Sequence, residues 1–126
     1  MPLHVIAPSP EHTVTTPNAV MAGLAAPSRG STALSTWTVR MEPGAAGPEH
    51  SVDQEQVWTV TAGTLTVTAG EDTETVPAGR TVVLPAGVLR RIRAGAGEGA
   101  EALVAMPAGG LVTAAGQETR PLPWAV

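Results

Sequence analysis

The sequence lacks cysteine, phenylalanine and tyrosine altogether, and its 126 residues include only three tryptophans. Without cysteine the chain can form no disulfide framework and offers no thiolate as nucleophile or metal ligand. With so few aromatic side chains, it does not have the stacking platforms of RNA-binding proteins or the aromatic cages that hold organic cations.

Lysine is also absent, and the seven arginines are outnumbered by 11 acidic residues, which gives a net charge of −4. This balance argues against a nucleic-acid partner held through its phosphates. No apolar run approaches the roughly 18 residues of a membrane span. Residues 1–10 show no basic segment followed by an apolar run, so we expect no signal peptide. We therefore expect a cytoplasmic protein with neither a nucleic-acid nor a membrane partner.

Glycine and proline are abundant, with 14 and 12 residues, and they lie between short apolar runs. Several of these runs alternate between apolar and polar residues, as β-strands with one buried face do. No segment has a convincing helical period. Short strands with frequent turns are typical of an all-β sandwich or barrel, here a single domain over residues 1–126.

The expected strands cover 33–41, 54–61, 64–68, 75–76, 81–84, 89–94 and 102–106. We expect the chain to turn at Ala62–Gly63, at 69–72 and at 95–99. Residues 1–17 are interpreted as an N-terminal arm or edge strand, and 107–126 as a C-terminal tail. His4 and His12 lie in the arm and are expected to be solvated.

Two segments share a regular spacing of glycine, proline and polar residues. In the first, Gly44 is followed after five residues by His50, and Gln56 is followed after six residues by Gly63. In the second, Gly79 is followed after five residues by the sequence Pro-Ala-Gly at 85–87 and then, after two more, by Arg90.

This spacing resembles the two motifs of the cupin superfamily, over residues 33–106. Within that superfamily the chain resembles small single-domain (monocupin) proteins of actinobacteria. The resemblance implies an antiparallel cupin-type β-barrel, or jelly roll, and a homodimer formed through a sheet face or an exchanged N-terminal strand. The apolar stretch 18–26 and the arm before it are candidates for that contact.

The resemblance also implies four metal-binding positions, which in the family hold three histidines and a carboxylate. Here they hold His50, Val52, Gln56 and Arg90. Valine donates no lone pair, an amide oxygen is a weak ligand and a guanidinium repels a cation. We therefore expect no metal cofactor. Binding of Fe, Mn, Ni or Zn would require His50 and Gln56 together with non-standard ligands. Glu55 could replace Gln56 as the carboxylate ligand only in a motif alignment that breaks the six-residue spacing to Gly63.

Strand alternation points Gln56 and Trp58 toward the barrel interior. If Arg90 also points inward, these residues and His50 form a polar site that can hold a small organic ligand, either neutral or anionic. His50 can carry a proton near neutral pH, and Arg90 can form a bidentate pair with a carboxylate or stabilise an oxyanion. The first hypothesis is thus a small-molecule-binding cupin with a degenerate metal site, capable of metal-independent acid/base catalysis at His50.

Other readings of these residues stay open. Arg90 can equally lie at a solvated strand end beside Arg91 and Arg93. His50 can be structural, bonded to Gln56 or Asp53. The side chains Trp58, Trp37 and Trp124 can serve as core packing, and the last two as dimer contacts.

Two further functions also remain open. One is a metal-dependent enzyme of dioxygenase, isomerase or polyketide-cyclase type. The other is a non-catalytic sensing or structural module whose interior is filled by Trp58, Met41 and Leu65. Fold alone does not decide among them.

Overall fold

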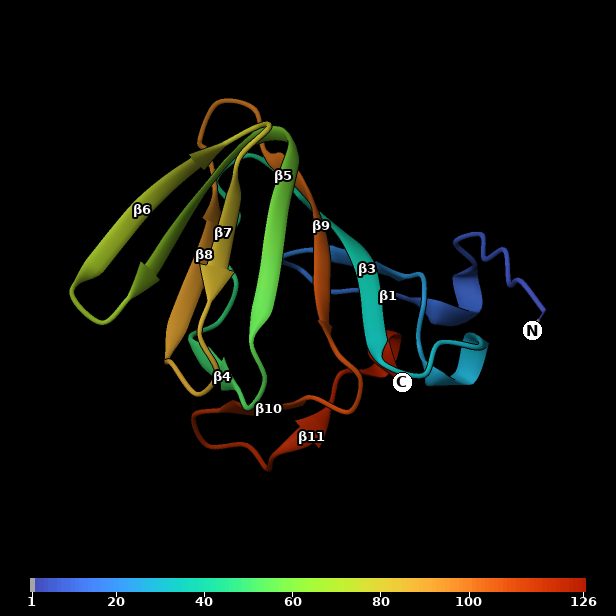
Figure 1. The fold of residues 1–126 in the computed structure, drawn as a ribbon. Coiled ribbons are helices and arrows are strands. Elements are labelled where there is room, and N and C mark those ends of the chain that lie inside the picture. Colours follow the sequence, from blue (N-terminus) through green and yellow to red (C-terminus); the bar gives the residue numbers. More distant parts are fainter. Residues whose placement is uncertain (1) are drawn as a thin grey trace.

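The computed structural model describes residues 2–126, and strands dominate it (Figure 1). The eleven strands are β1 Thr13–Thr15, β2 Val20–Gly23, β3 Leu34–Met41, β4 His50–Val52, β5 Gln56–Ala69, β6 Asp72–Pro77, β7 Thr81–Leu84, β8 Arg90–Ala94, β9 Ala100–Pro107, β10 Leu111–Ala114 and β11 Arg120–Pro121. Single 3-10 turns occur at η1 Pro10–His12, η2 Pro27–Arg29 and η3 Pro123–Ala125. Within residues 2–126, no helix has the length and apolar character needed to cross a membrane.

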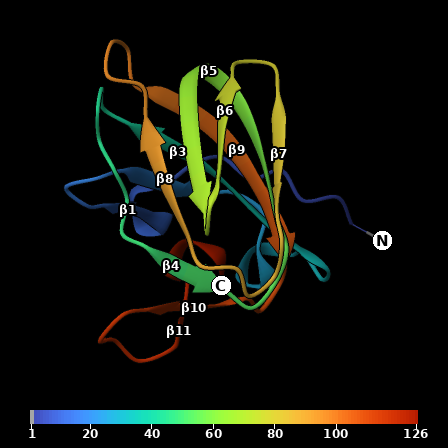
Figure 2. The ribbon, with the colours of Figure 1, turned by 90° about the vertical axis from the view of Figure 1, so that its left-hand side faces the viewer.

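All strand pairs are antiparallel, and the sheet order is β1-β2-β3-β9-β5-β8-β4-β10-β11, with β6 and β7 also paired to β5. Figure 2 shows how the sheet curls, so that β8 and β4 face β3 and β9 across an interior. The predicted all-β, antiparallel barrel is thereby confirmed.

The predicted turn at Ala62–Gly63 is wrong, because β5 continues without interruption through these residues. A register shift between Val60 and Ala62 bends the strand, and Gly63 adopts φ of +70°. The first part of β5 pairs with β7 and β9, whereas the part after the bend pairs with β6 and β8. A bulge with a glycine in the left-handed region allows one strand to serve both halves of a barrel.

The predicted C-terminal tail 107–126 contains two strands and a 3-10 turn. Within it, β10 pairs with β4, with Val112 opposite Val52, and so covers one end of the barrel. Neither β4 nor β10 exceeds four residues. Segments this short carry too little alternation to be recognised, and their pairing depends on residues far apart in sequence.

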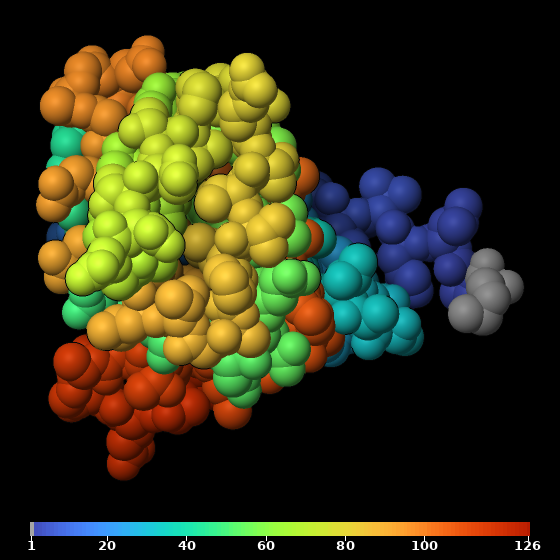
Figure 3. Space-filling model, turned by 60° about the vertical axis from the view of Figure 1, so that its left-hand side comes forward, coloured from blue at the N-terminus to red at the C-terminus, as the bar shows by residue number. Residues whose placement is uncertain are grey.

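The N-terminal region divides into a projecting segment and an edge hairpin. Residues 2–9 contain no regular structure, project from the barrel (Figure 3) and leave Leu3 and Val5 almost fully exposed. The strand β1 pairs with β2, and β2 with β3, in the same chain. The stretch 18–26, a candidate for a dimer contact, thus forms part of this sheet.

The core lies between the two halves of the barrel. Inward-facing residues of β3, β5 and β9 alternate with exposed ones, as in Trp37, Val60 and Val104, none more than 2% exposed. The predicted faces of 33–41 and 54–61 are therefore confirmed, with Leu65 buried after the bend. Burial of these apolar side chains stabilises the barrel, and the remaining space in its interior forms the site described next.

Candidate ligand site

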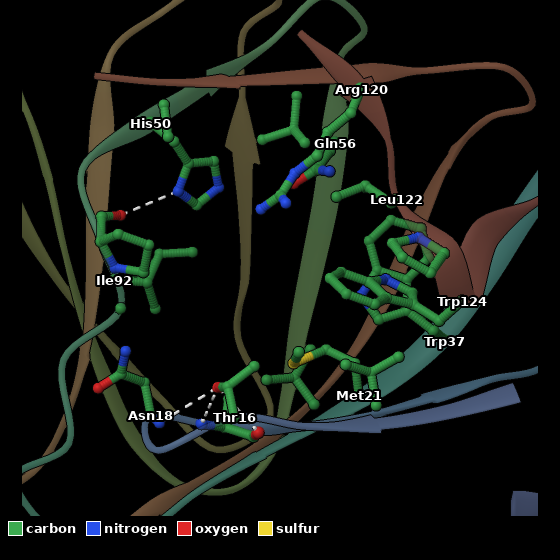
Figure 4. A pocket seen from close by; sticks show the side chains of 18 of the residues that line it. Thr16, Asn18, Met21, Trp37, His50, Gln56, Ile92, Arg120, Leu122 and Trp124 are labelled. Atoms are coloured by element: carbon green, nitrogen blue, oxygen red, sulfur yellow. Dashed lines mark hydrogen bonds between the residues drawn. The ribbon is translucent and has the colours of Figure 1, made fainter. Parts of the chain in front are cut away.

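A cavity of about 440 Å³ occupies the barrel interior (Figure 4). Its walls come from the inner faces of β3, β4, β5 and β8, from the β1–β2 hairpin, and from residues 112–124. The predicted site residues His50, Gln56, Trp58 and Arg90 all line it. This volume lies within the range of small-molecule sites, roughly 300–1,000 Å³.

Arg90 points into the barrel and not to solvent. The exposure pattern of β8 alternates, so that Arg90 and Ile92 are buried whereas Arg91 and Arg93 are exposed. Arg90 is only 2% exposed, and in the first part of β5 Gln56 and Trp58 are 1% and 7% exposed. The alternative of a solvated Arg90 at a strand end is therefore wrong.

Gln56 connects the site residues. Its Oε1 accepts hydrogen bonds from Arg90 Nη2 at 2.9 Å and from Trp58 Nε1 at 3.0 Å. Its Nε2 lies 3.5 Å from the sulfur of Met106, a weak acceptor. Because both strong donors meet one oxygen, the amide orientation is fixed, and Gln56 in turn orients the guanidinium.

His50 lies opposite Arg90 in the β4–β8 pair. Its Nδ1 lies 2.9 Å from the carbonyl oxygen of Pro48, which can only accept, so Nδ1 carries the proton. Its Nε2 accepts from Arg90 Nη2 at 3.3 Å. Burial and then the charge of Arg90 lower the pKa of His50, against the opposing hydrogen bond to Pro48. The imidazole is therefore neutral at pH 7.

The predicted structural partners of His50, Gln56 or Asp53, are wrong: among residues 2–126 its ring bonds to Pro48 and Arg90, and Asp53 Oδ1 accepts from the backbone N–H of Leu111 at 2.7 Å. This bond attaches the start of β10 to the β4–β5 connection. Glu55 is exposed and does not line the cavity. The two acidic residues next to the motif thus lie outside the site.

The guanidinium of Arg90 is a buried charge with neutral partners. Burial lowers the pKa of Arg90 to about 10, so it remains charged at neutral pH. Its side-chain partners are Gln56 and His50, and within residues 2–126 no group accepts a hydrogen bond from its Nε. A buried cation is costly unless an anion or several acceptors compensate it.

These residues do not fit a divalent metal ion. The imidazole lone pair on Nε2 of His50 faces a guanidinium, Gln56 Oε1 already accepts two hydrogen bonds, and Val52 offers no donor atom. Across residues 2–126, no three His, Cys, Asp or Glu side chains gather in a metal-binding group. The donor set therefore suits an anion better than a cation.

The tertiary structure adds residues to the site that the sequence pattern did not assign to it. Trp37 and Trp124, expected in the core or a dimer contact, both line the cavity and pack edge to face, with ring centroids 6.2 Å apart and an interplanar angle of 64°. Met41 and Arg120 line it as well, whereas His4 and His12 do not. Alternation in 33–41 was the available signal for Trp37 and Met41, whereas the sequence pattern gave none for Arg120 or Trp124.

Comparisons with known proteins agree with this architecture. Residues 37–106 match the family model described as Cupin domain. Oxalate decarboxylase from Bacillus subtilis superposes with a TM-score of 0.76 at 21% identity, covering 86% of this chain and 30% of that one. KdgF from Halomonas sp. superposes with a TM-score of 0.65 at 17% identity, covering 75% and 83%. A search of curated proteins finds no match.

These structural similarities concern the fold alone, because the sequences are so different. The chain spans about a third of the length of the oxalate decarboxylase chains it resembles. What it binds must therefore be argued from its own side chains.

Proposed function

This chain belongs to the cupin family, and we propose that its barrel binds a small organic anion directly on Arg90, without an intervening metal ion. The observation that carries the proposal is the buried Arg90 guanidinium at the cavity wall, whose side-chain partners, Gln56 and His50, are both neutral. A bound carboxylate would supply the missing counter-charge through charge-assisted hydrogen bonds.

The charges around the cavity support an anionic ligand. Among the described residues that line it, two are arginines, Arg90 and Arg120, and none is Asp or Glu. The whole chain, in contrast, has a net charge of −4. The charged side chains that line the cavity are thus positive, and a site of this sign attracts anions from solution.

Each polar residue has a distinct part in this proposal. Arg90 pairs with the anion, whereas Gln56 and Trp58 hold its guanidinium in place through the shared oxygen of Gln56. His50 accepts a hydrogen bond from Nη2 of Arg90 and so helps to hold the guanidinium in position. If the ligand is chemically transformed, His50 would be the proton carrier, and its Nε2 would first have to release Arg90, because Nδ1 is bonded to Pro48.

Isothermal titration calorimetry with phenylacetate and its near-isosteric amide, phenylacetamide, tests the proposal. We expect phenylacetate to bind the unmodified protein at least about tenfold more tightly, because only the carboxylate forms a charge-assisted pair. Arg90→Met should abolish this preference. Arg91→Met is the matched control, since Arg91 is on the same strand but exposed.

Equal affinity for the acid and the amide would overturn the proposal, as would a carboxylate preference that persists in Arg90→Met. Elemental analysis of the same protein samples excludes a metal-mediated contact. A stoichiometric divalent ion that disappears in His50→Ala would favour the metal-dependent alternative instead.

A further inference from the structure

We infer that the anion bound by this cupin carries a large apolar body, so that its ligand class is aryl or similarly bulky carboxylates and not small acids such as oxalate. The inference rests on the proposed function for the anionic head. It adds the part of the ligand that lies away from Arg90, which the remaining walls of the cavity determine.

Most residues of the cavity wall are apolar, but polar residues lie in two places. His50 and Gln56 lie together on one side and Thr16 and Asn18 on another, whereas Met21, Trp37 and Trp124 form an apolar wall (Figure 4). A ligand that contacts both Arg90 and this apolar wall must have a charged end and an apolar end. Sugars and other polyhydroxylated acids would leave hydroxyl groups against apolar walls, at the cost of lost hydrogen bonds to water.

The size of the cavity excludes a good fit for very small acids. Its volume of about 440 Å³ is roughly three times the ~150 Å³ of an apolar cavity that holds benzene. Acetate or oxalate on Arg90 would leave most of this space to water in contact with apolar side chains. A ligand with one or two rings would displace that water and bury its own apolar surface.

The aromatic wall is held in place before any ligand arrives. The turn η3 is fixed by Ser35 Oγ, which donates to the Ala125 carbonyl at 2.6 Å, and by Arg29 Nη2, which donates to the Trp124 carbonyl at 2.9 Å. Trp124 in turn packs edge to face on the buried Trp37. A wall that is already ordered costs little entropy when it binds a flat apolar group.

A series of carboxylates with growing bodies tests the inference on the unmodified protein. Dissociation constants are measured by calorimetry for acetate, oxalate, phenylacetate and 1-naphthylacetate. We expect phenylacetate to bind at least about tenfold more tightly than acetate or oxalate, and naphthylacetate at least as tightly as phenylacetate. Trp124→Leu should weaken naphthylacetate more than acetate, whereas Leu103→Ala, at an exposed site, should change neither.

Failure of the inference and failure of the proposed function give different results. If acetate or oxalate binds as tightly as the aryl acids and Arg90→Met abolishes binding, the anion site stands and the aryl ligand class is wrong. If phenylacetamide binds as tightly as phenylacetate, the anion site is wrong. Because the ligand series uses the unmodified chain, a variant that fails to fold does not affect either conclusion.

Discussion

Nη2 of Arg90 lies 3.3 Å from Nε2 of His50, and the two residues face each other in the β4–β8 pair. The guanidinium therefore donates to the one imidazole nitrogen that is not bonded to the backbone of Pro48. A nitrogen in this position cannot ligate a metal ion without placing that ion beside a fixed positive charge. In the proposed anion site, this pair occupies two of the positions at which the cupin resemblance implies metal ligands.

Substitutions that return metal ligands to positions 52, 56 and 90 should allow the protein to bind a metal ion. We expect the variant with Val52→His, Gln56→Glu and Arg90→His to bind one divalent ion, since it returns lone-pair donors to the four positions and removes the guanidinium. The unmodified protein should bind none with comparable affinity. Calorimetric titration with Zn²⁺ and Mn²⁺ measures both.

A second variant, Val52→His alone, is the control, because the guanidinium of Arg90 remains in it. If this variant binds metal as tightly as the triple variant, Arg90 is not what prevents coordination. If the folded triple variant binds no metal, the four motif positions do not form a coordination site in this chain.

Arg90→Met should leave the ligand-free protein as stable as the unmodified one, or stabilise it by up to about 2 kcal/mol. Replacement of a buried charge by an apolar group of similar length removes a desolvation penalty. Chemical denaturation measures the free energy of unfolding. A loss of more than about 3 kcal/mol would show that Arg90 is needed for folding and that its burial does not by itself indicate a ligand.

The stability of the protein should fall as the pH drops below the ordinary histidine pKa of 6.5. Burial and Arg90 lower the pKa of His50 in the folded state, so between these two values the unfolded chain binds a proton that the folded protein excludes. The contribution is present above pH 6.5 and is lost as the pH falls toward the folded-state pKa. His50→Asn should remove this part of the pH dependence, as measured by denaturation at several pH values.

The same charge predicts how a mutation moves the titration of His50. In Arg90→Met the pKa of His50 should rise relative to the unmodified protein, because one of the two causes that lower it is gone. NMR titration of the imidazole carbons measures this directly. An unchanged or lower pKa would contradict the contact between the two side chains.

Intrinsic fluorescence should report directly on the cavity. All three tryptophans line it, and the chain contains no tyrosine. A bound aryl carboxylate should therefore alter most of the emission, and Trp124→Phe should reduce the change. Titration with 1-naphthylacetate needs correction for its own absorbance, so phenylacetate is the better probe. An unchanged spectrum at a concentration that calorimetry shows to be saturating would place the ligand elsewhere.

The bend in β5 should be intolerant of a side chain at Gly63. A Cβ there would contact the carbonyl oxygen of Gly99 and lie 2.9 Å from the Cα of Ala100, in addition to requiring a positive φ. Gly70 has a similar φ of +61° but open space around it. Gly70→Ala should cost about 1–2 kcal/mol of unfolding free energy from backbone strain alone. Gly63→Ala should cost clearly more, and equal losses would contradict the close approach.

The sequence was sufficient for those parts of the fold that depend on local pattern. Alternation in 33–41 and 54–61 predicted which faces of β3 and β5 are buried, since side chains on a strand point to opposite sides in turn. The resemblance to the two cupin motifs implied that His50, Gln56 and Arg90 are neighbours. The turn expected at Gly63 was wrong because a positive-φ glycine serves a bend as well as a turn, and only the strands paired on either side distinguish the two.

The sequence by itself therefore determined the class of fold, through local alternation, and the positions of His50, Gln56 and Arg90 in the site, through their place in the two motifs. It did not determine which way Arg90 points, nor that Trp124 reaches the same cavity. Those features depend on contacts between distant segments: β4 beside β8, and η3 held against β3 through Ser35. The burial that leaves Arg90 without a counter-charge arises from several strands at once, and so only the tertiary structure shows it.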